Sequence, residues 1–74
     1  MDYQKLRRTV EERKTQFPKG SRVKLIFMDD PQAPKPGTLG TVRGVDDIGS
    51  ILVDWDSGGS LNVLQGVDRI ELVK

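Results

Sequence analysis

The fold is decided by residues 51–64, which read ILVDWDSGGSLNVL. Apolar and polar residues alternate at the start of this segment, as they do in a β-strand with one buried face. The Ser-Gly-Gly run at 57–59 indicates a tight turn, because glycine adopts the positive φ angles that such turns require. Leu61 and Val63 then predict a returning strand. The segment is therefore predicted to be a β-hairpin, with Trp55, the only tryptophan of the chain, near the end of its first strand.

Three further strands are predicted around this hairpin. Residues 21–28 alternate in the same way, residues 38–45 resume strand character with two glycines that indicate a bulge or a bend, and residues 70–73 form the last strand. Residues 29–37 hold three of the four prolines and form a loop, since proline cannot donate to a sheet ladder. This pattern predicts a mainly β fold, a five-stranded SH3-like antiparallel barrel. The side chains expected to face its interior are Val23, Leu25, Val42, Ile51, Val53, Leu61 and Ile70.

One N-terminal α-helix is predicted ahead of the strands. Residues 2–16 contain neither glycine nor proline and are rich in helix-forming residues. Phe17 precedes a proline, and the residue before a proline avoids helical dihedral angles. The narrow apolar stripe of this amphipathic helix consists of Tyr3, Leu6 and Val10. The chain is therefore divided into a helix over residues 1–18 and a barrel over residues 19–74, with the stripe either packed on the barrel or docked on a partner.

The composition excludes several classes of function. The 74 residues include neither cysteine nor histidine, which excludes disulfides, thiolate nucleophiles and the common zinc-ligand sets. A domain of this size seldom has a cleft that shifts catalytic pKa values, so we expect no enzymatic activity and no cofactor. No stretch has the length and apolarity of a membrane span, and the first residues lack the pattern of a signal peptide. We therefore expect a cytoplasmic protein that does not contact a membrane.

The net charge of +1 hides an asymmetry between the two parts of the chain. Residues 1–20 carry six basic and three acidic side chains, a net charge of +3, whereas residues 21–74 carry six basic and eight acidic side chains, a net charge of −2. A barrel that bound a nucleic-acid backbone along its own surface should be basic instead. The basic part of the chain is therefore the helix, which either packs on the barrel by its apolar stripe or docks on an acidic partner, nucleic acid or a second copy of the chain.

The residue pattern also resembles known families. The runs GSRV at 20–23, GTLGTV at 37–42 and VDWDSG at 53–58 resemble KOW-type and Mind-bomb/Herc-type barrels. Over residues 19–73 the chain is more similar still to a family of uncharacterised small domains from phages and conjugative elements of Gram-positive bacteria. The segments that carry this second resemblance are 28–31, 36–37, 40–42, 45–49, 55–56 and 66–68. The resemblance implies an SH3-like barrel and no catalytic residues, and it implies a ring-bearing side chain where this chain has Gln32.

These observations predict a small, non-enzymatic binding module. The first hypothesis is a phage- or mobile-element-encoded adaptor or inhibitor that binds a host protein, and the acidic barrel with only 5% aromatic residues favours it. The alternative is nucleic-acid or nucleotide binding through the basic helix and the barrel rim. In that alternative the phosphate contacts come from Arg7, Arg8, Arg13, Lys14 and Lys19, and the stacking rings from Trp55 or Phe27. The chain is expected to be a monomer or a dimer formed through the helix.

The candidate partner-binding residues are Arg7, Arg8, Lys14, Asp30, Gln32, Trp55 and Asp56. Some of these have a structural interpretation beside the functional one. Trp55 alternates in phase with Val53, which favours core packing with its indole N–H bonded to a backbone acceptor. Asp30 lies before a proline and is typical of a turn. Asp54 and Asp56 could hold a cation with a neighbouring turn aspartate, but aspartates beside tight turns more often bond their own backbone, so no metal site is expected.

Overall fold

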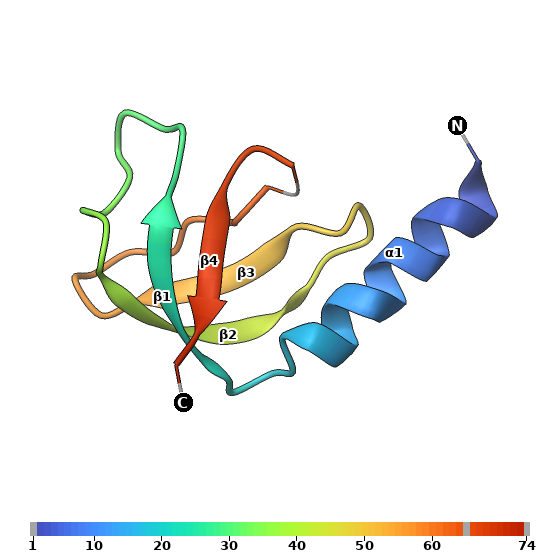
Figure 1. Ribbon diagram of the computed structural model, residues 1–74, viewed down its shortest axis with the longest axis horizontal. Coiled ribbons are helices and arrows are strands. Elements are labelled where there is room, and N and C mark those ends of the chain that lie inside the picture. Colours follow the sequence, from blue (N-terminus) through green and yellow to red (C-terminus); the bar gives the residue numbers. More distant parts are fainter. Residues whose placement is uncertain (1, 65, 74) are drawn as a thin grey trace.

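The chain folds as one helix followed by an antiparallel sheet of four strands (Figure 1). The computed structural model describes residues 2–64 and 66–73. Its elements in chain order are α1 (Tyr3–Gln16), β1 (Arg22–Phe27), β2 (Leu39–Val45), β3 (Ile51–Trp55) and β4 (Arg69–Leu72). The strands lie in the order β3-β2-β1-β4, and all neighbours are antiparallel. The fold is therefore mainly β, as predicted, with an open sheet whose edges are β3 and β4.

The predicted fourth strand at Leu61 and Val63 is not a strand in the structure. Residues 60–63 run beside β3 but pair with it only through two isolated bridges, Ile51 with Val63 and Asp54 with Ser60. The physical reason lies between these bridges, where the carbonyl of Leu61 accepts a hydrogen bond from the indole Nε1 of Trp55 at 3.2 Å. Among the described residues, no backbone N–H of β3 donates to that carbonyl. The sheet therefore has four strands in the described residues instead of the predicted five.

The core lies on the concave side of this sheet, and alternation along the strands places its residues. Val53 is buried and Asp54 is exposed, so the register predicted for the hairpin is confirmed. The buried cluster consists of Val23, Leu25, Val42, Ile51, Val53, Trp55 and Val63. The half-buried apolar side chains packed against it are Phe17, Met28, Val45, Leu61 and Ile70. The predicted interior set is therefore confirmed for its first five members, while its last two, Leu61 and Ile70, lie at the border of the core.

The two glycines of β2 serve different purposes. The register between β2 and β3 shifts between Val42 and Gly44, so Gly44 lies at the predicted bulge. Gly40 is regularly paired with Trp55, and a Cβ atom on it would come within 2.6 Å of the Val53 side chain. Gly40 therefore allows β2 and β3 to approach closely, which a larger residue would prevent.

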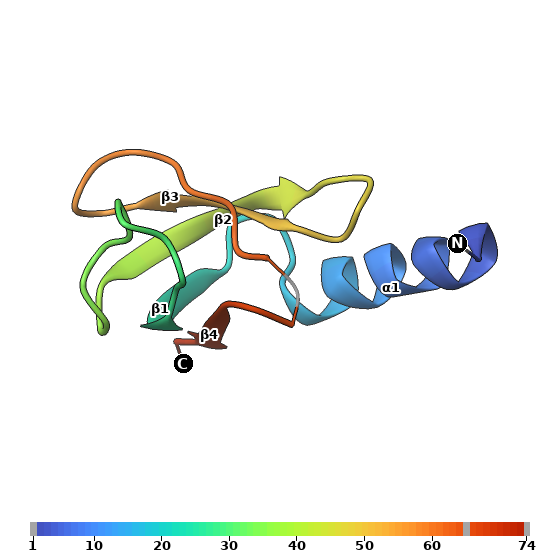
Figure 2. The ribbon, with the colours of Figure 1, turned by 90° about the horizontal axis from the view of Figure 1, so that it is seen from above.

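The helix is held at its C-terminal end and extends away from the sheet at the other. The Asp2 carboxylate caps α1 by accepting from the N–H groups of Gln4 and Lys5 at 3.0 and 3.2 Å. Val10 is buried and α1 contacts β2, whereas Tyr3 is 70% exposed where the helix projects from the sheet (Figures 1 and 2). The apolar stripe thus packs on the sheet only in part. No helix in the described part of the chain has the length and apolarity needed to span a bilayer.

Candidate functional site

The structure does not bring the predicted partner-binding residues together. Arg7, Arg8 and Lys14 lie on α1, whereas Asp30 and Gln32 lie in the loop between β1 and β2 at the opposite end of the molecule (Figures 1 and 2). The Asp30 carboxylate accepts from the backbone N–H of Gln32 at 2.7 Å, which confirms its interpretation as a turn residue. The predicted residues therefore do not form one site.

Trp55 is a core residue. Its side chain is 4% exposed and its Nε1 donates to the backbone carbonyl of Leu61 at 3.2 Å. A ring in this position is covered by the protein and does not present a face on which a ligand could stack. The core-packing interpretation of Trp55 is confirmed, because the strand directs its side chain inward.

Asp56 forms an ion pair with Arg22 at the end of β3. The guanidinium donates to both carboxylate oxygens, with Nη1 to Oδ1 at 2.9 Å, and the same Nη1 reaches the Thr41 hydroxyl at 2.8 Å. These hydrogen bonds hold the pKa of Asp56 below its ordinary value and raise the pKa of Arg22. Asp56 thus joins β1 to the end of β3, and its carboxylate is already occupied.

Acidification is expected to remove the stabilisation that this ion pair provides. The pKa of Asp56 is lower in the folded chain than its unfolded value of about 3.9, so the pair stabilises the fold at every pH above that value. The stabilisation is lost as the pH falls through the folded pKa. Wild type and Asp56→Asn should therefore differ in melting temperature at neutral pH, and the difference should be modest because both side chains of the pair are half exposed. It should shrink as the pH is lowered from neutral past the unfolded pKa. A difference that stays constant across this range would contradict the ion-pair explanation.

The other carboxylates considered for a cation are also engaged. Asp46 accepts from the N–H groups of Ile48 and Ser50 within the β2–β3 turn. Asp54 accepts from the Ser60 hydroxyl and lies 3.6 Å from the Arg43 guanidinium. Within residues 2–64 and 66–73, no three acidic side chains gather as a metal site would need.

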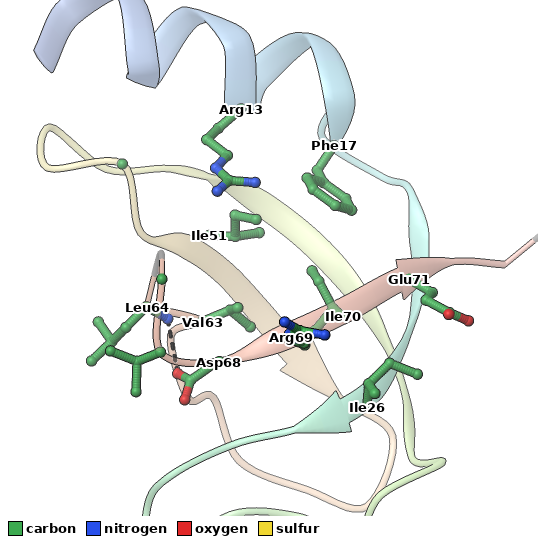
Figure 3. Close-up of a pocket in the computed structure, with 13 residues that line it drawn as sticks. Arg13, Phe17, Ile26, Ile51, Val63, Leu64, Asp68, Arg69, Ile70 and Glu71 are labelled. Carbon is green, nitrogen blue, oxygen red and sulfur yellow. Dashed lines mark hydrogen bonds between the residues drawn. The ribbon is translucent and has the colours of Figure 1, made fainter. Parts of the chain in front are cut away.

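A groove of about 430 Å³ lies between the end of α1, β4 and the segment that leads into β4 (Figure 3). We call it the α1–β4 groove. Its apolar lining comes from the end of α1, from β1, β3 and β4, and from the segment before β4, and consists of Phe17, Ile26, Ile51, Val63, Leu64, Val67 and Ile70. Its charged lining consists of Arg13, Asp68, Arg69 and Glu71. Leu64 and Val67 are about half exposed, so the groove presents apolar surface to solvent beside charged groups.

The charged side chains of the α1–β4 groove differ in whether another group of the protein already binds them. The Asp68 carboxylate is occupied, because it accepts from the N–H groups of Leu64 at 2.9 Å and Asp29 at 3.0 Å. Arg13 points from α1 toward Ile51 (Figure 3), and among the described residues its guanidinium donates to the neutral Gln16 side chain at 3.2 Å. Among the described residues, neither Arg13 nor Arg69 has a carboxylate within 4.0 Å. The groove therefore offers two cations next to an apolar floor, together with the carboxylates of Asp68 and Glu71. A carboxylate of an apolar segment fits where it reaches Arg13 or Arg69.

A second groove, of about 410 Å³, lies on another side of α1 against the β2–β3 turn. Its lining consists of Tyr3, Leu6, Arg7, Val10, Glu11, Lys14, Asp47 and Ile48. Two of the predicted residues, Arg7 and Lys14, thus share a surface, whereas Arg8 lines neither groove. Lys14 lies 3.8 Å from Glu11, and Asp47 adds a second negative charge. Like the α1–β4 groove, this groove has two basic and two acidic side chains, but one of its cations, Lys14, already has a carboxylate within ion-pair distance.

Sequence reasoning did not select Arg69, which lines the α1–β4 groove. Arg69 precedes an apolar residue in a short terminal strand, which locally indicates only an exposed strand position. Arg13 was noticed for its charge alone. The two arginines become neighbours of one groove only when the end of α1 packs beside β4. The one available signal was the exposed pair Leu64 and Val67 in the segment before the last strand, where a solvated loop would be polar.

Residues 6–73 match the family model described as "Domain of unknown function (DUF4314)". The matched range covers most of α1 and every strand of the sheet, so both sides of the α1–β4 groove lie within it. No curated protein and no solved structure matches the chain at a significant level.

Proposed function

The chain belongs to the DUF4314 family, an uncharacterised family of small domains as predicted, and we propose that it is a non-enzymatic protein-interaction module that binds an acidic segment of a partner protein. The observation that carries this proposal is the α1–β4 groove, in which Arg13 and Arg69 lie beside an apolar floor without a carboxylate partner in the described residues. The adaptor or inhibitor role, the mobile-element origin and the cytoplasmic location implied by the sequence form part of the same proposal.

The chemistry of the groove favours a segment that is both apolar and acidic. Ile51 and Val63 are already buried, so the apolar surface that a ligand can remove from water belongs to Ile70 and to Leu64 and Val67. Its burial contributes about 25 cal/mol for each Å². Carboxylates that reach the two guanidinium groups add charge-assisted hydrogen bonds, which select for acidic residues. Leu64 and Val67, already half exposed, extend the apolar contact at the rim.

The SH3-like barrel is retained as part of the proposal. The two bridges from β3 to residues 60–63 support it, because they continue the sheet past β3 where the predicted fourth strand would lie. The central position of β1, which pairs with both β2 and β4, also supports it. In this description the α1–β4 groove occupies the gap between the two edges of the open sheet.

Nucleic-acid binding through α1 has weaker support. Arg7 and Lys14 share their groove with Glu11 and Asp47, and Lys14 lies within ion-pair distance of Glu11. These carboxylates would repel a phosphate backbone. If the alternative were correct, binding to a random single-stranded oligonucleotide would weaken steeply with rising salt and would depend on Arg7 and Arg8.

Neutralising either groove arginine is expected to weaken binding of an acidic peptide. The probe is an alternating glutamate–valine peptide of about eight residues, acetylated and amidated at its ends, which matches the length of a strand. Arg13→Gln and Arg69→Gln should each raise its Kd about fivefold, the size of an ion pair of about 1 kcal/mol near the surface. Isothermal titration calorimetry at about 0.15 M salt measures this, with long-range charge effects screened.

The matched control is Arg8→Gln, which removes the same charge from an exposed position of α1 outside both grooves. Its Kd should equal that of wild type, and a glutamine–valine peptide should bind wild type more weakly. Equal effects of Arg8→Gln and Arg13→Gln would show that only net charge matters, and failure of wild type to bind the acidic peptide would reject the proposed function.

A further inference from the structure

The free edge of β4 borders the α1–β4 groove. Among the described strands β4 pairs only with β1, so its other edge carries backbone groups without a ladder partner. Arg69, Ile70 and Glu71 of β4 all line the groove. An edge strand of this kind is a template on which another extended chain can pair.

The register identifies which backbone groups are free. Lys24 lies opposite Glu71, Val23 lies opposite Leu72, and the N–H of Val73 donates to the carbonyl of Arg22 at 2.9 Å. In an antiparallel ladder this geometry makes the Val23–Leu72 pair a non-hydrogen-bonded one. The N–H and C=O groups of Leu72, and by the same alternation those of Ile70, therefore point away from β1.

We propose that the acidic segment of the partner binds in an extended conformation and adds a strand to β4, pairing with the free backbone groups of Ile70 and Leu72. This inference rests on the proposed function and specifies how the segment lies. Side chains alternate along a strand, so every second residue of the segment faces the apolar floor with Ile70. The residues between them face the side of β4 that carries Arg69 and Glu71. A carboxylate is the favourable cross-strand neighbour of Arg69, so the register must place it opposite Arg69 and not opposite Glu71.

A partner segment fits this edge better than a second copy of the chain does. The edge lies between the end of α1 and the segment before β4, which together line the groove. A single extended segment can enter there. A second copy would have to bring its own α1 and its own Leu64 and Val67 into the same space. Leu72 is 48% exposed, so the edge remains open beyond the groove.

Two N-methylated forms of the glutamate–valine probe test the inference. In a strand, residues that face the same side direct their N–H groups to the same edge. One form is methylated on its valine amides and the other on its glutamate amides, so only one of them blocks the groups that pair with β4. We expect one form to lose at least about tenfold in affinity and the other to bind like the unmodified peptide.

Equal affinities of the two forms, whether both high or both low, would overturn strand addition. If the unmodified peptide still binds and still depends on Arg13 and Arg69, the proposed function survives while this inference fails. If the unmodified peptide does not bind, the proposed function itself fails.

A second experiment changes the protein instead of the peptide, at the edge of β4 where the two are proposed to pair. Leu72→Pro removes an N–H that points away from β1, so the ladder to β1 is kept and the edge is blocked. Leu72→Ala is the matched control for the lost side chain. We expect Leu72→Pro to bind the probe at least about tenfold more weakly than Leu72→Ala, with both folded by circular dichroism. A wild-type dimer in sedimentation that Leu72→Pro dissociates would instead assign the edge to a second copy and contradict the proposal.

Discussion

Trp55→Ala is expected to lower the free energy of unfolding by about 3–5 kcal/mol, the range of large-to-small substitutions of buried aromatic residues. Trp55 is 4% exposed within the central cluster, and its indole N–H holds the Leu61 carbonyl. The substitution therefore leaves a cavity and also removes the hydrogen bond that holds Leu61 beside β3, while the bridges at Ser60 and Val63 remain. Domains of this size have little stability to lose, so urea unfolding at room temperature should show a partly unfolded variant.

The control for this prediction is Trp55→Phe, which keeps an aromatic ring and loses the N–H. It should cost less than the alanine variant, and the difference between the two measures the packing contribution. If Trp55→Ala unfolded at the same urea concentration as wild type and lost peptide binding instead, Trp55 would be a binding residue and the core assignment would be wrong.

Gly40→Ala is expected to have the second-largest effect, a loss of at least about 1–3 kcal/mol, which is typical of overpacked cores. A Cβ atom at this position would lie 2.6 Å from Cγ1 of Val53, 2.8 Å from Cε3 of Trp55 and 3.0 Å from the Asp54 carbonyl oxygen. Two of these contacts are with fully packed side chains, so β2 and β3 would have to separate. Thermal unfolding of the variant measures the cost.

A double-mutant cycle with Val53→Ala provides the control for Gly40→Ala. Removing the Val53 methyl groups removes the closest contact, so Gly40→Ala should cost less in the Val53→Ala background than in wild type. Strict additivity would show that the two residues do not meet, and a Gly40→Ala variant as stable as wild type would contradict the close approach of β2 and β3.

Much of the fold could be predicted because local patterns determine it. Alternation assigned Val53 to the core and Asp54 to solvent, and a one-residue error would have exchanged them. The proline-rich loop after β1 and the end of the helix before Pro18 follow from backbone restrictions that act on single residues. The missing fourth strand could not be predicted, because the indole bond to Leu61 becomes visible only in three dimensions.

The candidate site was less predictable because it depends on contacts between residues that are distant in the sequence. Asp56 was a candidate for its charge, but Arg22, 34 positions earlier, occupies its carboxylate. Arg13 and Arg69 come from the two ends of the chain and meet at one groove only after α1 packs beside β4. Counting charges along the sequence was enough to predict that the helix is basic. Which of these charges lie beside the apolar floor of the groove could be seen only in the folded chain.

The central claim is that the α1–β4 groove binds an extended acidic segment, and backbone amide chemical shifts test it most directly. Isotope-labelled wild type is titrated with the alternating glutamate–valine peptide, and the shift of every assigned amide is followed. The account predicts the largest changes at Arg13, Ile51, Leu64 and Ile70, which line the α1–β4 groove. The largest changes at the second groove, marked by Ile48, or no changes at all, would contradict it.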